Sequence, residues 1–536
     1  MTFKTLKHKI MKKLIFLVLI FPVLASFLSC KKSFLDEKSD SAYSPLNTFK
    51  NVAGLDAGIA GLQASVREQY TMQVTQSLLA VFQVGTDVAL NGLDAGEAAP
   101  FENYALLNSE SPAVINYWNW SYKVINNANL IIKGASDSTA VLTNAQRAVY
   151  LGEAKFYRAY AYNFLVTLWG QVPLIDQPLE APKTDFTRAS LENLNTLINS
   201  DLVFATTNLP NIDAVSKPGR ISKEAAQQLL AEAYLRQGKN DLAEAQCLNI
   251  INSKKFSVIN ARFGVKRTLP GDAFSDMFIV GNQRRRQGNT EAIWVQEMEY
   301  NIPGGSSSLD QHRRVWVPYY SNVAGMIVAD SLGGRGIGRI RLSSWVIKGL
   351  YKGNDMRNSV YNIKRDFYYN DPKNAKFGQK VIPLAADTLY KIVPFTTKWN
   401  HYLDADPTGN GAYKDLMMMR LGETYLLLAE AQFKQAKLTE AAISVNVLRT
   451  RANAAQVTIS DISLDFILDE RVRELIGEEN RRMTLARTGT LIDRVKKLNF
   501  IQNATVQPFH QLLPIPQSEI DLNKDAVITQ NPGYIR

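Results

Sequence analysis

The sequence has few residues of the types that build metal centres, disulfides or nucleic-acid contacts. It contains two cysteines and four histidines in 536 residues. The histidines, His8, His312, His401 and His510, never approach the His-Glu-x-x-His spacing of a zinc protease. Dense Lys/Arg tracts are also missing, and the basic triplet 284–286 is expected to be a solvated loop rather than a nucleic-acid contact. We therefore expect no metal, no cofactor and no nucleic-acid partner.

Other catalytic motifs are incomplete. No Gly-x-Ser-x-Gly elbow occurs. The glycines of 333–338 have the outer spacing of a phosphate loop, but Arg339 and Ile340 follow where Lys and Ser/Thr are needed, so a mobile loop is expected. Residues 404–415 imitate a calcium loop, although Pro407 stiffens the segment and Asp415 replaces the usual glutamate. A plain turn explains the same residues, and calcium binding near Asp404 stays open.

The amino-terminal apolar stretch is too short to span a membrane. Residues 14–28 are 15 uncharged residues, whereas a spanning helix needs roughly 20. The stretch follows Lys12 and Lys13 and ends at Ser29-Cys30, which is typical of a signal peptide over residues 1–29 with lipid attachment at Cys30. Translation could begin at Met1 or Met11 with the same mature chain. Processing would lower the formal charge from +11 to +6, because it removes five lysines.

Helical periodicity dominates the rest of the chain. The spacing of apolar residues predicts a helix from Ser222, a break at 237–239 and a second helix to residue 252. Residues 229–251 align without gaps to 427–449 with eight identities in 23 positions, so the chain contains an internal repeat of tetratricopeptide character. In this pair Cys247 is expected to be a packing residue. A related helix over 152–170 carries Arg158 on its apolar face, and Arg158 needs a carboxylate partner that the sequence does not identify.

Between the two repeats lies a stretch rich in Gly, Pro, Asn and aromatics, which holds four of the seven tryptophans. Long irregular inserts in helical scaffolds are often functional, so we expect this stretch to face the ligand. The fold class predicted is all-α, with tetratricopeptide-like helix-turn-helix repeats and a long loop-rich insert. The predicted parts are a signal peptide (1–29), a lipidated tether (30–45), an N-terminal helical region (46–255), the loop-rich region (256–415) and a C-terminal helical region (416–536), with 46–536 as one compact unit.

Five segments, in order, resemble the SusD/RagB family of Bacteroidetes surface lipoproteins. They are 29–40 with a Phe-Leu-Asp after the cysteine, the helix that ends in the Gly-x-Val-Pro turn at 170–173, the late helix pair 418–454, the charged helix 469–489, and 512–534 at the chain end. The resemblance implies a binding subunit rather than an enzyme. It implies a lipid anchor in the outer membrane, exposure to the cell exterior, and a SusC-like TonB-dependent transporter that receives a captured glycan or, in some members, a peptide.

The candidate ligand residues combine aromatic rings with polar groups, because a sugar offers an apolar face to a ring and hydroxyls to polar side chains. The family draws its ligand surface from an early and a middle loop, which points to Asp87, Phe101, Asn103 and Tyr104, and to Arg313, Arg314, Trp316, Tyr319 and Tyr320. Core packing remains an alternative for each aromatic residue. The rival functions are a surface glycoside hydrolase, which would need a carboxyl pair facing a cleft, and a protein-binding scaffold or adhesin. The charges of 470–474 are expected to form structural ion pairs.

Overall fold

The computed structural model describes residues 48–71, 78–93, 96–302, 310–501 and 504–534. Residues 49–536 form one unit, and its described part is mostly helical with a few short strands, which confirms the predicted fold class. Among the described residues, no helix combines the length and apolar character needed to cross a membrane. The predicted signal peptide, Cys30 and the tether to residue 45 lie outside the described residues, so their roles stay predictions.

In the amino-terminal half, each long helix packs on the next long helix. Polar residues define several of their starts; Ser190, for example, accepts a hydrogen bond from the Asn193 amide at 3.1 Å and caps the helix that begins at Leu191. The helices are α3 (Val52–Thr71), the short α4 (Ala99–Glu102), α5 (Pro112–Ser136), α6 (Asn144–Trp169), α7 (Leu191–Asn208), α8 (Lys223–Arg236) and α9 (Asn240–Asn252).

The internal repeat is present as two helix pairs that stack on each other. Ser222 accepts a hydrogen bond from the Ala225 amide at 3.2 Å, so α8 begins where the sequence predicts. The second pair is α12 (Leu421–Lys434) and α13 (Leu438–Arg451), and α12 packs against α9 of the first pair. Cys247 on α9 is fully buried, and burial raises the pKa of its thiol. This confirms that Cys247 is a packing residue.

Arg158 finds its carboxylate on the neighbouring helix. Its Nε and Nη2 atoms donate to Asp201 of α7 at 2.7 and 2.9 Å, and both residues are buried. Lys155, one turn earlier on α6, donates to the same carboxylate at 2.7 Å. A carboxylate partner offsets part of the cost of burying a guanidinium. The pair therefore fixes α6 against α7.

The stretch between the repeats contains only short elements among its described residues. The sheets β1–β3, β2–β6 and β4–β5 are each two-stranded and antiparallel. Apart from 3-10 turns, its elements are α10 (Ala273–Asp276), α11 (His312–Trp316), a π-helical turn (Trp345–Leu350), β2 (Ala292–Gln296), β3 (Ile340–Leu342), β4 (Ile363–Lys364) and β5 (Phe395–Thr396). The paired strands β1 (Ala89–Asn91) and β6 (Leu416–Arg420) come from outside this stretch. Because β6 leads directly into α12 and pairs with β2, this stretch is joined to the helical scaffold.

Two small apolar cores support this stretch beside the main core. One is built around Phe274 and Phe278, and the other around Phe367 and Phe395. The glycine loop 333–338 belongs to this packed interior and is not the exposed mobile loop that was expected. A Cβ atom on Gly336 would lie 2.1 Å from the Val317 carbonyl oxygen, so close backbone approach explains the glycine there.

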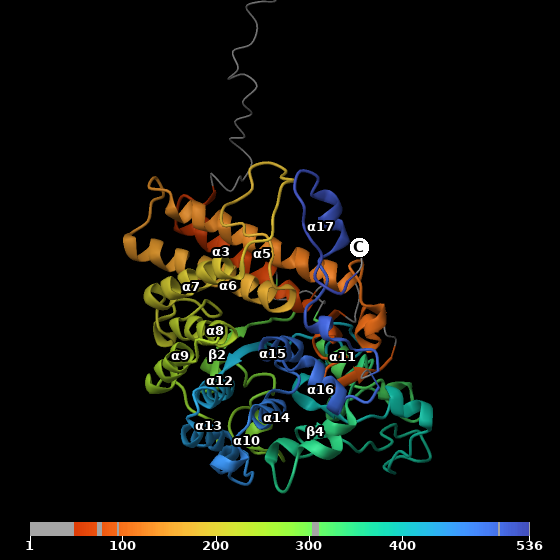
Figure 1. The fold of residues 1–536 in the computed structure, drawn as a ribbon. Coiled ribbons are helices and arrows are strands. Elements are labelled where there is room, and N and C mark those ends of the chain that lie inside the picture. Colours follow the sequence, from red (N-terminus) through yellow and green to blue (C-terminus); the bar gives the residue numbers. More distant parts are fainter. Residues whose placement is uncertain (1–47, 72–77, 94–95, 303–309, 502–503, 535–536) are drawn as a thin grey trace, which may run out of the picture. The chain divides into compact units, whose positions relative to one another are not determined.

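The carboxy-terminal helices complete the unit. They are α14 (Leu464–Leu475), α15 (Arg481–Thr488), α16 (Leu491–Leu498) and α17 (Gln517–Leu522), and α17 lies beside α5 at the upper right of Figure 1. Glu474 of α14 is fully buried and accepts hydrogen bonds from Arg357 at 3.1 Å, Arg420 at 2.6 Å and Arg451. The charges of 470–474 are thus structural ion pairs, as the sequence predicted.

Candidate functional site

The early-loop candidates for ligand binding lie mostly inside the protein. Asp87 is fully buried and accepts hydrogen bonds from Arg481 at 2.6 and 2.9 Å and from Arg494 at 2.7 Å. Burial by itself raises the pKa of Asp87, but the two guanidinium groups outweigh it and hold the pKa below its ordinary value. Phe101 and Tyr104 are also buried, and the Arg482 guanidinium lies 4.6 Å from the centre of the Phe101 ring. These side chains pack the core.

The middle-loop candidates are placed similarly. Arg313, Arg314, Trp316 and Tyr320 are buried on or next to α11, and the Tyr320 hydroxyl donates to the Gly334 carbonyl oxygen at 2.7 Å. A buried ring has no face left for a sugar, and Arg313 and Arg314 line neither of the two cavities described below, so these four residues, like Asp87, Phe101 and Tyr104, are core residues in this structure. Asn103 and Tyr319 are half-buried, and for these two the ligand role stays a prediction.

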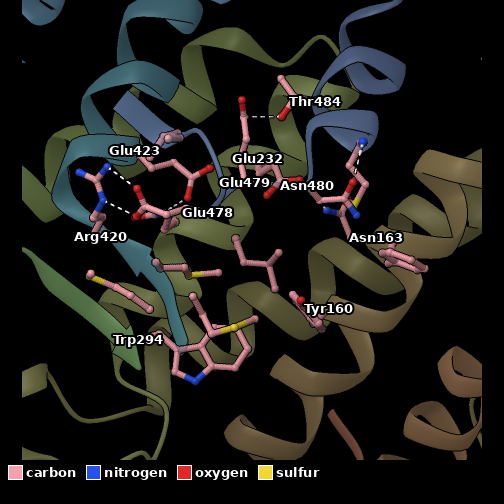
Figure 2. A pocket seen from close by; sticks show the side chains of 18 of the residues that line it. Tyr160, Asn163, Glu232, Trp294, Arg420, Glu423, Glu478, Glu479, Asn480 and Thr484 are labelled. Atoms are coloured by element: carbon pink, nitrogen blue, oxygen red, sulfur yellow. Dashed lines mark hydrogen bonds and ion pairs between the residues drawn. The ribbon is translucent and has the colours of Figure 1, made fainter. Parts of the chain in front are cut away.

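One cavity lies between the helix pairs and is shown in Figure 2. Its lining includes Tyr160, Asn163, Glu232, Trp294, Glu423 and Thr484. The charged groups are largely satisfied by one another: Arg420 donates to Glu478 at 2.6 and 2.9 Å, and Arg471 donates to Glu423 at 2.9 Å. Burial raises the pKa of Glu423. The cavity measures about 90 Å³, which admits a few waters but falls short of the roughly 300–1,000 Å³ of ligand sites.

A larger cleft of about 650 Å³ lies in the loop-rich stretch. Its lining residues fall between positions 262 and 414. The neutral lining includes Phe278, Tyr361, Tyr402, Ser275, Ser331 and Asn400. The charged lining consists of Arg262, Lys266, Lys364, Lys414, Asp276, Asp330 and Asp404. By size and by composition, this cleft is the candidate binding site.

Two tyrosines give the cleft the surfaces that a sugar needs. Tyr361 precedes β4 and is 39% exposed, and Tyr402 is half-buried. Neither hydroxyl has a hydrogen-bond partner within the described residues, so both can serve a ligand. The backbone at Tyr361 is held because Thr397 Oγ1 donates to its carbonyl oxygen at 2.5 Å. The sequence predicted this region as ligand-facing, but it offered no signal that separated Tyr361 and Tyr402 from aromatics of the core.

One of the residues that suggested calcium is used in another way. Asp415, at the last position of the calcium-like loop, accepts hydrogen bonds from Arg284 at 2.6 and 2.9 Å. Arg284 is itself buried, so this member of the basic triplet is not in a solvated loop as expected. Across the described part of the chain, no group of three or more His, Cys, Asp or Glu side chains is arranged to hold a metal.

The fold and the cleft together define a helical-repeat binding protein, and the comparisons with known proteins agree. Residues 351–534 match the model of the "SusD family", and residues 33–235 match the model "Starch-binding associating with outer membrane". A SusD-like protein of Formosa agariphila is 24% identical over 98% of this chain and 100% of its own length. The starch-binding protein SusD of Bacteroides thetaiotaomicron is 32% identical over 26% of this chain and 25% of its own. The chain belongs to the SusD/RagB family.

Solved structures show the same fold. A "Laminarin binding SusD-like protein" has a TM-score of 0.69 at 23% identity and covers 90% of this chain and 100% of that one. NanU of Bacteroides fragilis has a TM-score of 0.71 at 21% identity, with 93% and 100% covered. At these identities the likeness concerns the fold.

Proposed function

We propose that the protein is a lipid-anchored outer-membrane protein that captures a glycan in the cleft and passes it to a SusC-like TonB-dependent transporter. The observation that carries this proposal is the cleft of about 650 Å³ with Tyr361 and Tyr402 in its lining and their hydroxyls free. Family membership supports it, as do relatives named for starch and laminarin binding. Each stacked ring contributes about 0.5–1.5 kcal/mol, which suits reversible capture.

The pairing of the cleft's carboxylates with cations favours binding of a glycan without its cleavage. Retaining and inverting glycosidases need two carboxyl groups that face the scissile bond. Asp276 accepts a hydrogen bond from Arg262 at 2.6 Å, and Asp330 pairs with Lys266 at 3.1 Å. Asp404 is the third carboxylate of the lining and is exposed. Two of the three are therefore occupied by cations, which fits a binding protein better than a hydrolase.

The test is calorimetry on the mature chain, with Cys30→Ser to prevent acylation, against starch, laminarin and a set of other soluble glycans and peptides. Binding of a glycan is expected, with no product on chromatography. Tyr361→Ala and Tyr402→Ala should each weaken that binding about 3- to 10-fold through loss of a ring contact. Tyr368→Ala is the matched control, because Tyr368 is 49% exposed and is not part of the cleft lining.

Three results would contradict the proposal. Release of shortened sugars would indicate a hydrolase. Binding of peptides but of no glycan would favour the peptide-binding alternative within the family. Equal losses for the cleft variants and Tyr368→Ala would show that the cleft is not the binding site.

The transporter partner is tested separately. Copurification of the native protein with a large membrane transporter is expected, and capture of a soluble partner instead would favour the scaffold or adhesin.

A further inference from the structure

The cations of the cleft fall into two groups. Arg262 is paired with Asp276, and Lys266 is paired with Asp330. Lys364 and Lys414, in contrast, make no ion pair with any carboxylate of the described chain, although both line the cleft. Lys364 is half-buried on β4. These two ammonium groups are therefore available for a charged ligand.

Lys414 is unusual because it is almost completely buried. It is 2% exposed, and the one hydrogen bond of its Nζ atom goes to the Asn400 carbonyl oxygen at 3.0 Å. Removing an ammonium from water is costly unless a carboxylate compensates it. Lys398 shows the ordinary solution: it is 3% exposed and pairs with Glu478 at 2.5 Å. No carboxylate of the described residues forms an ion pair with Lys414 in this way, and Asp310, Asp415 and Asp330 act on its charge only from beyond ion-pair distance.

A second buried cation lies behind the same wall of the cleft. Arg313 is 1% exposed, and its Nη1 atom donates to the His401 carbonyl oxygen at 3.2 Å. Its other hydrogen bonds go to the carbonyl oxygens of Arg335 and Gly409 and to His401 Nδ1 at 3.4 Å, so none of the described carboxylates is its partner either. Burial, together with the charges of Arg313 and Lys414, lowers the pKa of His401 to about 4. Two buried cations therefore lie near His401, and the carboxylates of Asp310 and Asp330 offset part of their effect on its pKa.

The carboxylate of the cleft that has no cation partner, Asp404, lies at the surface, unlike Lys414. Asp404 is exposed and has no hydrogen bond or ion pair within the described residues, whereas Lys414 is buried. The uncompensated carboxylate therefore lies where water screens it, and the uncompensated ammonium lies where screening is weak. A ligand that enters the cleft meets a positive interior.

We infer that the cleft is selective for acidic glycans, with a carboxylate or sulfate group of the sugar bound by Lys414 and Lys364 while the rings contact Tyr361 and Tyr402. The inference rests on the proposed glycan-binding function and adds the substrate class to it. Charge-assisted hydrogen bonds to an anion are about twice as strong as neutral ones, so the bound anion would supply the partner that Lys414 lacks.

The test compares three probes by calorimetry on the mature chain: neutral laminari-oligosaccharides, oligogalacturonides that carry carboxylates, and carrageenan oligosaccharides that carry sulfates. At least one acidic probe should bind about tenfold more tightly than the neutral one, and which of the two binds more tightly identifies the anionic group. That preference should shrink when the salt concentration is raised from about 0.05 M to about 0.5 M.

Lys364→Met should reduce the preference for the acidic probe about 3- to 10-fold and leave binding of the neutral probe unchanged. Lys496→Met is the control, because Lys496 is exposed on α16 and is not part of the cleft lining. Lys414→Met is measured alongside, with circular dichroism to verify its fold, and the salt series keeps the test valid if that variant does not fold.

The outcomes distinguish a failure of the acidic selectivity from a failure of the proposed glycan-binding function. Binding of neutral and acidic probes with equal affinity overturns the acidic selectivity and leaves the glycan-binding function intact. An unchanged preference in Lys364→Met together with a flat salt series also overturns it. If no glycan binds and a peptide does, the proposed function fails, and the selectivity fails with it.

Discussion

Buried charge is the feature that individual side chains contribute most clearly to this protein. Glu474 is surrounded by three guanidinium groups and is fully buried. Burial alone raises its pKa, but Arg451, Arg420 and Arg357 outweigh burial and hold the pKa well below the ordinary 4.5. Such a group stabilises the fold only as long as it is ionised.

Glu474→Gln should therefore lower the free energy of unfolding by about 3–5 kcal/mol at pH 7, because three buried arginines lose one of their counter-charges. The contribution is fully present above pH 4.5, the ordinary value, and is lost as the pH falls toward the lowered pKa, so wild type and variant should converge in acid. Urea unfolding across this range measures it. Glu440→Gln, at an exposed position of α13, should change little, and an equal loss there would contradict the argument.

Removing the charge of Lys414 should affect stability in the opposite direction to removing the charge of Glu474. Burial lowers the pKa of Lys414 from 10.5 to about 7. The charged groups that face it are the carboxylates of Asp310, Asp415 and Asp330 and the ammonium of Lys266. The folded protein thus releases a proton that the unfolded chain still holds between pH 7 and 10.5. In that range stability rises with pH, and below pH 7 the buried ammonium costs stability.

Lys414→Met should accordingly raise the free energy of unfolding by about 1–4 kcal/mol at pH 6, and the gain should shrink as the pH approaches 10. Thermal unfolding at several pH values provides the measurement. Lys398→Met is the comparison, since it removes one of the two cations that pair with Glu478 and should destabilise the protein. A loss of stability in Lys414→Met at every pH would mean that the ammonium is already compensated in the free protein.

Helix pairs are held together by a few polar contacts in addition to their apolar faces. Asp201 of α7 is fully buried and receives hydrogen bonds from both Arg158 and Lys155 of α6. Asp201→Asn should lower the free energy of unfolding by about 3–5 kcal/mol, because two cations at the helix interface lose their partner. Differential scanning calorimetry tests this. Asp241→Asn, at an exposed position in the first turn of α9, is the control, and similar losses in both variants would exclude a special role for the α6–α7 contact.

For the protein as a whole, attachment to the membrane is expected to depend on one residue. The chain should be cleaved before Cys30 and acylated there, since each buried methylene of an acyl chain contributes about 0.8 kcal/mol to membrane binding. Mass spectrometry of the mature amino terminus and membrane fractionation test this. Cys30→Ser should abolish membrane association, whereas Cys247→Ser, at a buried position of α9, should not. An unmodified thiol on the processed chain would refute the prediction.

Much of the scaffold could be predicted because its signals are local. The start of α8 at Ser222 and the repeat that becomes α8–α9 and α12–α13 follow from helical spacing and capping, which act over a few residues. The ligand residues could not be predicted in the same way. Tyr104 and Tyr361 are both aromatic residues in segments between long helices, yet Tyr104 is fully buried and Tyr361 is 39% exposed.

The sequence by itself determined the helical repeats, the family resemblance and the stretch of chain from which the cleft is built, since periodicity, capping and composition are properties of neighbouring residues. Only the tertiary structure decided that Asp201 is the partner of Arg158, that the aromatic residues of 101–104 and 316–320 are mostly core, and that Lys414 is buried without a carboxylate. Solvent exposure and ion pairing depend on contacts between segments far apart in the chain, and local sequence patterns do not predict which segments are in contact.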